Sequence, residues 1–259
     1  MKGSVEGLFR FPVKGLSAEP LDVVALQPGK GFPHDRELGF LRPTAAFDPE
    51  HPEPLAKTNF YMLARDAALA GLRTRYDPER RTLTIAAGED ERAFALDTPE
   101  GSAGAEAAIA ETLSLPADER PRLVHGNGHR FTDVSVTSAT FMNAVSLINL
   151  ASVRDLGERT GTTLDPLRFR GNIVFDGWPA WSELDAGEAI IEVGPLRLKA
   201  LKRTQRCAAT TVNPATAMRD VFVPRLLMEH YGHADMGIYA EVLTAGTIHP
   251  GDTIRLAEA

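Results

Sequence analysis

The chain contains a single cysteine, Cys207, among its 259 residues, and this scarcity excludes several kinds of site. One thiol cannot form a disulfide within the chain, and it cannot supply the Cys-x-x-Cys ligands of a structural zinc or an iron–sulfur cluster. A chain without disulfides fits a reducing compartment, so we expect a cytoplasmic protein. Any sulfur chemistry must therefore use one thiol acting alone.

Long apolar runs and excess positive charge are also missing. No stretch of about 18 apolar residues is present to span a membrane, and the N-terminal Met-Lys-Gly-Ser-Val-Glu segment is not a signal peptide. The formal net charge of -7 argues against partners held by phosphate contacts, such as nucleic acids. Neither a GxGxxG turn after a strand, nor a Walker loop, nor a GxSxG elbow occurs. We expect a small-molecule substrate and no nucleic-acid or membrane partner.

Positive charge is concentrated beside the one cysteine. Lys199, Lys202, Arg203 and Arg206 all precede Cys207 by fewer than nine positions in an otherwise acidic chain. Nearby cations favour the thiolate, which binds soft metals. A lone cysteine is more often a small buried apolar side chain, and the solvent face of a strand can carry Lys and Arg for solubility. Both interpretations stay open on this segment alone.

Three further groups of polar residues fall at the ends of predicted strands. Lys14 follows the first strand, Arg36 opens the third, and Arg170 and Asn172 lead into a strand at 173–175. Taken singly, each is ordinary for a solvent-exposed loop. A β-barrel brings strand ends from distant positions onto one rim, where arginine holds phosphate with a two-pronged fork and lysine as a point charge. Together they predict an anion-binding site.

The apolar pattern predicts many short strands and few helices. Apolar content of 43% and charged content of 24% are ordinary for a soluble globular protein. We expect helices at 64–76, 102–113, 149–160 and 222–230. We expect strands at 5–11, 21–26, 37–41, 82–86, 93–96, 145–148, 173–175, 189–193, 196–201, 237–243 and 253–256. Short strands at close spacing favour a β-barrel decorated by helices.

Several segments, in order along the chain, resemble the MOSC-domain family, named for the molybdenum-cofactor sulfurase C-terminal domain. Phe-Pro-Val-Lys-Gly at 11–15, with Asp-Arg at 35–36, is similar to the family's N-terminal motif. Arg-Phe-Arg-Gly-Asn-Ile at 168–173 and Arg-Cys-Ala-Ala-Thr-Thr-Val-Asn-Pro at 206–214 resemble its two later motifs. The closing stretches at 237–242 and 246–252 also fit. The resemblance extends to soluble bacterial relatives of the mitochondrial amidoxime-reducing component.

The resemblance implies a fold and a domain arrangement. The fold class would be mainly β (α+β): a MOSC-type β-barrel with decorating helices and a smaller inserted α/β lobe. Residues 1–37 and 121–259 would form the barrel core, and residues 38–120 the inserted lobe.

The resemblance also implies a molybdenum cofactor, a pterin dithiolene with a phosphate tail. In the amidoxime-reducing members the cysteine is a protein ligand to molybdenum, and this role maps to Cys207 as metal ligand and catalytic residue. The residues that would contact the cofactor are Lys14, Gly15, Arg36, Asn143, Arg170, Asn172, Thr204, Arg206 and Tyr239. Many members carry a second cysteine where this chain has Thr204, so a two-cysteine sulfur relay is excluded. Gly171, Asn213 and Ala217 are further departures from the family pattern.

Two functions follow from the resemblance. The first is a molybdenum-dependent oxidoreductase that reduces N-hydroxylated or N-oxide-type substrates with electrons from a separate transfer protein. The alternative is a non-catalytic carrier of the molybdenum cofactor or of a Cys207 persulfide, and a MOSC fold without cofactor also stays open. Pyridoxal-phosphate binding has been suggested for MOSC domains as a class. We expect no such role here, because no lysine is expected in the desolvated setting that a Schiff base needs.

Overall fold

The structure is a computed structural model that describes residues 1–257, and its main body is a closed β-barrel. Seven strands follow one another around it in the order β10-β9-β13-β12-β11-β15-β1, and β1 pairs back to β10. The barrel strands are β1 (Lys2–Arg10), β9 (Val145–Asn149), β10 (Ile173–Asp176), β11 (Ile190–Val193), β12 (Leu196–Gln205), β13 (Asp235–Val242) and β15 (Thr253–Leu256). The expectation of a mainly β fold built on a barrel is confirmed.

Side chains fill the barrel because its strands alternate between inward apolar and outward polar positions. In β12, Leu196, Leu198 and Ala200 are buried, while Arg197 between them is exposed. The three buried residues join one apolar cluster that includes Trp178 and residues from every barrel strand. Such small barrels have interiors just wide enough for side chains, so a ligand must bind outside the interior, at the strand ends.

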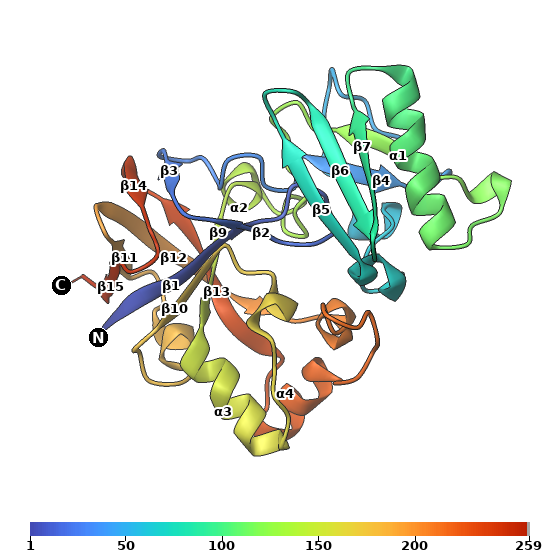
Figure 1. Ribbon diagram of the computed structural model, residues 1–259. Helices are drawn as coiled ribbons and strands as arrows, with labels where there is room; N and C mark the ends of the chain where they lie inside the picture. The colour runs from blue at the N-terminus through green and yellow to red at the C-terminus, as the bar shows by residue number, and fades with distance from the viewer. Residues whose placement is uncertain (258–259) are drawn as a thin grey trace.

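Two helices pack on one end of the barrel, at the bottom of Figure 1. Helix α3 (Leu150–Thr160) connects the parallel strands β9 and β10, and α4 (Val223–Tyr231) precedes β13. The side chain of Asn149 caps α3 by accepting a hydrogen bond of 3.1 Å from the Ala151 amide. Gly161, at φ +64°, ends the helix. Both helices lie where the apolar periodicity predicted them.

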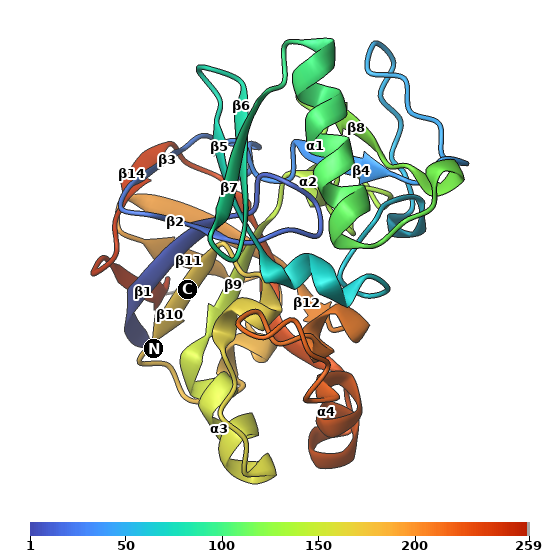
Figure 2. The ribbon, with the colours of Figure 1, turned by 45° about the vertical axis from the view of Figure 1, so that its right-hand side comes forward.

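A second packed body lies above the barrel in Figures 1 and 2. It consists of the meander β5 (Leu72–Asp77), β6 (Thr82–Ala87) and β7 (Asp90–Ala95), helix α1 (Pro99–Thr112), and the two-stranded sheet of β4 (Leu38–Leu41) and β8 (Arg122–His125). It has an apolar core of its own. We call this body, together with the segment 42–71 that links β4 to β5, the lobe. The β4–β8 ladder pairs residues on both sides of the expected boundary at 120, so the division of the chain at 37 and 120 stays a prediction.

The expected helix at 64–76 is wrong. The segment contains a short 3-10 helix, η2 (Ala67–Gly71), and then the strand β5. From residue 72 onward the burial alternates: Leu72, Thr74 and Tyr76 are buried, and the residues between them are exposed. The pattern therefore changes from helical spacing to a period of two, and the three-stranded meander stabilises the strand.

The remaining elements are short. They are β2 (Glu19–Leu21), which pairs with β1; the ribbon of β3 (Val24–Leu26) and β14 (Gly246–Ile248); helix α2 (Ala139–Met142); and the 3-10 helices η1 (Lys57–Asn59), η3 (Ala117–Glu119), η4 (Pro166–Phe169), η5 (Ser182–Asp185) and η6 (Ala208–Thr211). None of the helices among residues 1–257 is both long and apolar enough to cross a membrane.

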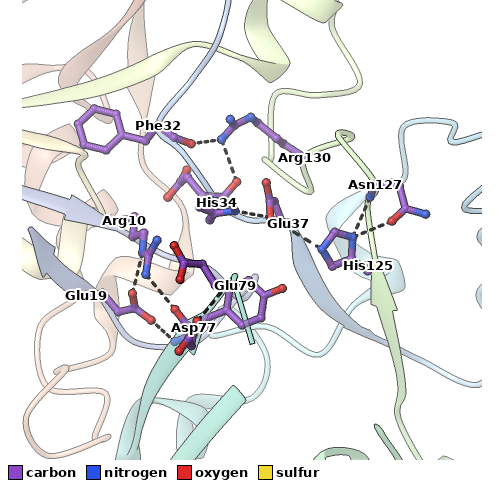
Figure 3. A network of polar contacts seen from close by, with 12 residues as sticks. Arg10, Glu19, Phe32, His34, Glu37, Asp77, Glu79, His125, Asn127 and Arg130 are labelled. Atoms are coloured by element: carbon purple, nitrogen blue, oxygen red, sulfur yellow. Dashed lines mark hydrogen bonds and ion pairs between the residues drawn. The ribbon is translucent and has the colours of Figure 1, made fainter. Parts of the chain in front are cut away.

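Polar contacts tie the barrel to the lobe, and Figure 3 shows part of this network. Arg10 of β1 donates from Nε to Glu19 at 2.6 Å and from Nη2 to the Tyr76 carbonyl of β5 at 2.9 Å. Glu19 in turn accepts the Tyr76 amide at 2.5 Å. These bonds fix the lobe against the first strand, which places lobe residues at the rim of the barrel.

Candidate functional site

A cavity of about 270 Å³ lies where the ends of the barrel strands meet the lobe. Every sequence-predicted site residue except Asn143 lines it, although they come from five distant parts of the chain. They are Lys14, Gly15, Arg36, Arg170, Asn172, Thr204, Arg206, Cys207 and Tyr239. The three groups of polar residues predicted at strand ends therefore lie on the same rim of the barrel as Cys207.

Asn143 lies elsewhere. It ends helix α2, and its Nδ2 donates to the Ala139 carbonyl at 3.2 Å. It borders a small separate hollow that Gly29 and Glu241 also line. Its neighbour Ala144 lines the larger cavity, whereas the Asn143 side chain bonds back to its own helix. The structure therefore places Asn143 outside the lining of that cavity.

Two arginines pack against one buried phenyl ring. The guanidinium carbons of Arg36 and Arg170 lie 4.8 Å and 4.3 Å from the ring centroid of Phe11. Arg36 also pairs with Asp35 and donates to the Arg170 carbonyl at 3.1 Å. Both arginines adopt left-handed backbone conformations, with φ of +54° and +52°. Non-glycine residues held in the left-handed backbone conformation recur at functional sites. Here the two strained residues both direct cationic side chains to one cavity.

Burial raises the free energy of the charged form of these arginines. Burial, together with the nearby charge of Arg36, lowers the pKa of Arg170 to about 9. Burial likewise lowers the pKa of Arg206 to about 10. A guanidinium keeps its proton in proteins. The electrostatic cost is therefore relieved most directly by an anion in the cavity.

Arg206 is held in place by backbone carbonyls. Its Nε donates to the Met236 carbonyl at 2.8 Å and its Nη1 to the Phe169 carbonyl at 2.7 Å. The guanidinium also lies 5.4 Å from the Phe169 ring centroid. These contacts connect the end of β12 to β13 and to η4, so the cation next to Cys207 has a fixed position.

A carboxylate with two lysines forms the other wall, and sequence reasoning missed two of the three residues. Lys14 Nζ donates to Asp133 at 2.5 Å and to the Phe131 carbonyl at 2.8 Å, and Lys57 Nζ lies 3.3 Å from Asp133. Burial opposes ionisation of Asp133, but the charges of Lys14 and Lys57 outweigh it and hold the pKa of Asp133 well below its usual range. Lys57 belongs to the lobe, and no local motif distinguishes it or Asp133 in the sequence.

The thiol lies at the junction of β12 and η6. The Cys207 carbonyl accepts hydrogen bonds from the Thr210 amide at 3.0 Å and the Thr210 hydroxyl at 2.9 Å, which fixes the backbone that carries the thiol. Cys207 is partly exposed and lines the cavity. The alternative of a fully buried apolar side chain is therefore wrong.

Two buried hydroxyls in the cavity wall have no hydrogen-bond partner. They belong to Thr204, which is 3% exposed, and Thr132, which is 9% exposed. An unsatisfied buried hydroxyl costs about 1–3 kcal/mol. A ligand that accepts hydrogen bonds at this wall would recover that cost.

Asn172, Gly15 and Tyr239 shape the cavity. Asn172 accepts the Ser146 amide and donates to the Phe9 carbonyl, both at 3.1 Å, so it fastens β9 to β1. Gly15 has φ +83°, and a Cβ there would lie 3.0 Å from Met62 Cα of the lobe. Burial raises the pKa of Tyr239 above its ordinary value. Glycine at position 15 thus allows the close approach of barrel and lobe.

Of the cations that precede Cys207 in sequence, Lys202, Arg203 and Arg206 line the cavity and Lys199 does not. Lys199 pairs with Glu188 at 3.1 Å, and Arg203 pairs with Asp185 at 3.0 Å. Both carboxylates lie away from the lining of the cavity. Of the run that precedes the thiol, Arg206 is the member whose guanidinium is buried at the site. The remaining surplus of positive charge comes from Lys14, Arg36, Lys57 and Arg170.

The expectation that no lysine lies in a desolvated setting is wrong. Lys14 is only 7% exposed, and burial lowers its pKa, although Asp133 opposes this effect. A desolvated lysine is therefore present. Its ammonium is already engaged by Asp133 and the Phe131 carbonyl.

Together, the barrel and its cationic cavity place the Cys207 thiol beside buried positive charge at the strand ends. A family profile described as MOSC domain matches residues 125–255. That span covers half of the chain, so the chain belongs to the MOSC domain family.

Similar proteins include amidoxime-reducing components of animals. The chain is 27% identical over 149 residues to "Mitochondrial amidoxime-reducing component 1" from Homo sapiens, which covers 53% of this chain and 44% of that protein. The protein of the same name from Danio rerio is 27% identical over 64% of this chain and 56% of its own length. The chain thus spans about half the length of these relatives. Among solved structures, the YUAD protein from Bacillus subtilis matches 98% of this chain and 94% of its own at 13% identity, with a TM-score of 0.45.

Proposed function

We propose that the chain binds a molybdenum cofactor in this cavity and reduces N-hydroxylated or N-oxide-type substrates. The observation that carries the proposal is the convergence of the Cys207 thiol with buried cations whose charge the protein leaves unbalanced. Thiolate is a ligand that suits soft metals, and arginine forks suit phosphate. Membership of the MOSC family and the similarity to proteins named amidoxime-reducing component support the same assignment.

The residues present fit such a cofactor. Within residues 1–257, no three His, Cys, Asp or Glu side chains gather into a metal site. A metal at Cys207 would thus take its other ligands from the cofactor, as a dithiolene allows. The two unpartnered threonine hydroxyls and the surplus of buried guanidinium groups match an anionic, oxygen-rich ligand.

The protein's own residues have distinct roles in this proposal. Cys207 would hold the metal, Arg36, Arg170 and Arg206 would balance the charge of the cofactor, and Thr204 would donate a hydrogen bond to it. When bound, the cofactor supplies a centre that exchanges two electrons. Reduction of an N–O bond to N–H consumes two electrons and two protons and releases water, so a separate electron-transfer protein must supply the electrons.

Metal analysis of a matched pair of variants tests the proposal. In a host that makes the cofactor, the purified wild-type protein should contain molybdenum and show pterin fluorescence. The Cys207→Ser variant should lose most of its molybdenum. Ala208→Ser places the same side chain at the neighbouring exposed position, outside the cavity lining, and should keep the metal. Equal molybdenum in wild type and Cys207→Ser, or none in either, would contradict the proposal.

A carrier of persulfide sulfur is the second candidate, and the partial exposure of Cys207 favours it. Mass spectrometry of the intact protein after exposure to a sulfur donor distinguishes the two functions. A carrier should gain one sulfur atom on Cys207 and pass it to an acceptor thiol. A protein that stays unmodified under these conditions is no persulfide carrier.

A further inference from the structure

We propose that a second, largely apolar cavity beside the first binds the aromatic or alkyl body of the substrate. This inference rests on the proposed function, because it assigns the reacting N–O group to the first cavity. The second cavity has a volume of about 210 Å³. Most of its wall is apolar: Phe11, Leu16, Ala18, Leu63, Ala70, Leu167, Ala209, Val212 and Pro214.

The two cavities are neighbours with a common wall. Gly15, Leu63, Arg168, Arg170 and Ala209 line both. At Gly15 and Ala209 the common wall carries almost no side chain. We infer that a molecule with one polar end and one apolar end crosses the wall there.

The arginines of the common wall are engaged by the protein itself. Arg170 donates to the Leu16 carbonyl at 2.5 Å, and Arg168 pairs with Asp220 at 2.7 Å. On the far side, Arg73 donates to the Gly88 carbonyl at 3.2 Å. Lys14, Arg36, Lys57 and Arg206 line the first cavity and not the second, so most of the surplus positive charge belongs to the first, and the second offers a largely apolar surface. This contrast orients a substrate with its N–O group toward Cys207.

The volume fits an aromatic ring. An apolar cavity of about 150 Å³ holds benzene in an engineered protein, so this cavity has room for one ring with a small substituent. Adding or removing one methylene in an apolar pocket changes kcat/KM about 10–200-fold. The inferred substrate class is thus N-hydroxylated compounds with an aromatic or branched alkyl body, rather than the smallest members of the series.

Barrel and lobe both contribute to this cavity, and η2 of the lobe offers a matched pair for a test. Ala70 lines the cavity, and Ala68 on the same short helix is exposed and does not. Ala70→Phe places a ring in the cavity far from Cys207, and Ala68→Phe adds the same ring at the surface. Ala18→Leu fills the cavity from the barrel side.

The experiment compares benzamidoxime with acetamidoxime on the cofactor-loaded protein, and measures benzamidoxime binding by calorimetry. Wild type should favour benzamidoxime in kcat/KM by at least about tenfold. Ala70→Phe and Ala18→Leu should remove most of that preference and weaken benzamidoxime binding, while activity on acetamidoxime, molybdenum content and melting temperature stay unchanged. Ala68→Phe should behave as wild type.

The possible failures are distinguishable. Equal turnover of the two amidoximes by wild type, or equal losses on both in the two cavity-filling variants, overturns the apolar site and leaves the proposed function intact. A protein without molybdenum or turnover that still binds benzamidoxime, with an affinity that Ala70→Phe lowers, retains the site and loses the proposed function. No calorimetric binding and no preference in turnover overturns the inference outright.

Discussion

Two polar regions lie at the junction of barrel and lobe, and they differ in how their charges are matched. In the network of Figure 3, Arg10, His34 and His125 have carboxylate partners. Arg10 pairs with Glu19 at 2.6 Å, and Glu37 lies 3.0 Å from His34 and 3.8 Å from His125. Arg130 donates to the carbonyls of Phe32 and Asp35.

The cavity at Cys207 has more cations than carboxylates. Arg36 pairs with Asp35, and Lys14 and Lys57 share the one carboxylate of Asp133. Arg170 and Arg206 have only carbonyl partners, and two threonine hydroxyls have none. The matched network of Figure 3 holds the barrel and the lobe together, whereas the cavity keeps an excess of positive charge.

Removal of a charge from the matched network should have the largest effect on stability. Glu19 and Arg10 have side chains only 10% and 15% exposed. Loss of one partner from such a pair costs about 3–5 kcal/mol, because the other charge stays buried. Glu19→Gln should lower the free energy of unfolding in urea by about that amount.

Glu192→Gln is the control for this measurement. Glu192 pairs with Arg255 on the barrel surface, where the arginine side chain is 50% exposed. Exposed pairs contribute about 0–1 kcal/mol. If Glu19→Gln costs no more than Glu192→Gln, the contrast drawn between the two regions is wrong.

Removal of a charge from the cavity should affect stability less and ligand binding more. In the cofactor-free protein, Arg170→Met keeps the packing on Phe11 and removes an unbalanced cation, so the free energy of unfolding should change by less than about 1.5 kcal/mol. Inorganic pyrophosphate at a hundredfold its dissociation constant should stabilise wild type by about 2.7 kcal/mol. Arg170→Met should lose most of this stabilisation in a thermal shift measurement.

Lys199→Met serves as the matched control for Arg170→Met. Lys199 is close to Cys207 in sequence but pairs with Glu188 away from the cavity. The stabilisation by pyrophosphate should be unchanged in this variant. Equal losses in both variants would indicate that charge along β12, and not the cavity, binds the anion.

The smallest expected effect concerns pH. Burial lowers the pKa of His125 below its ordinary value of 6.5, although Glu37 opposes this effect. Below that ordinary value the unfolded chain therefore binds more protons at this position than the folded chain does. Stability should fall as the pH drops from neutral through about 6.5 toward the folded-state pKa, and level off below it. Urea denaturation at several pH values should show a flatter profile for His125→Gln, and an unchanged profile would contradict this assignment.

The sequence predicted which distant segments meet, because each carries a compact motif at a strand end. Lys14, Arg36, Arg170 and Cys207 share one cavity as the barrel prediction requires. Lys57 and Asp133 could not be found in this way. Lys57 begins the short 3-10 helix η1 and Asp133 lies in a turn, neither with a local motif, and only the docking of the lobe on the barrel brings them together.

Two further differences have local physical causes. The helix expected at 64–76 relied on apolar spacing near Ala67 and Ala70, but pairing with β6 imposes a strand from Leu72 onward. Ala217, where the family pattern has glycine, adopts φ +58°, so the loop keeps its left-handed turn without the residue best suited to it. Neither the pairing partner of a strand nor a left-handed backbone conformation at alanine can be predicted from the local sequence alone.

The place of β1 in the barrel has a consequence for biosynthesis. The ribosome makes β1 first and β15 last, yet the two strands are neighbours, with Gly3 opposite Ile254. The meander of the lobe uses contacts between adjacent segments and can form during translation, whereas barrel closure must wait until β15 has been made. The cavity has walls from distant parts of the chain, from Lys14 to Tyr239. The cavity can therefore be complete only after β13 has been made.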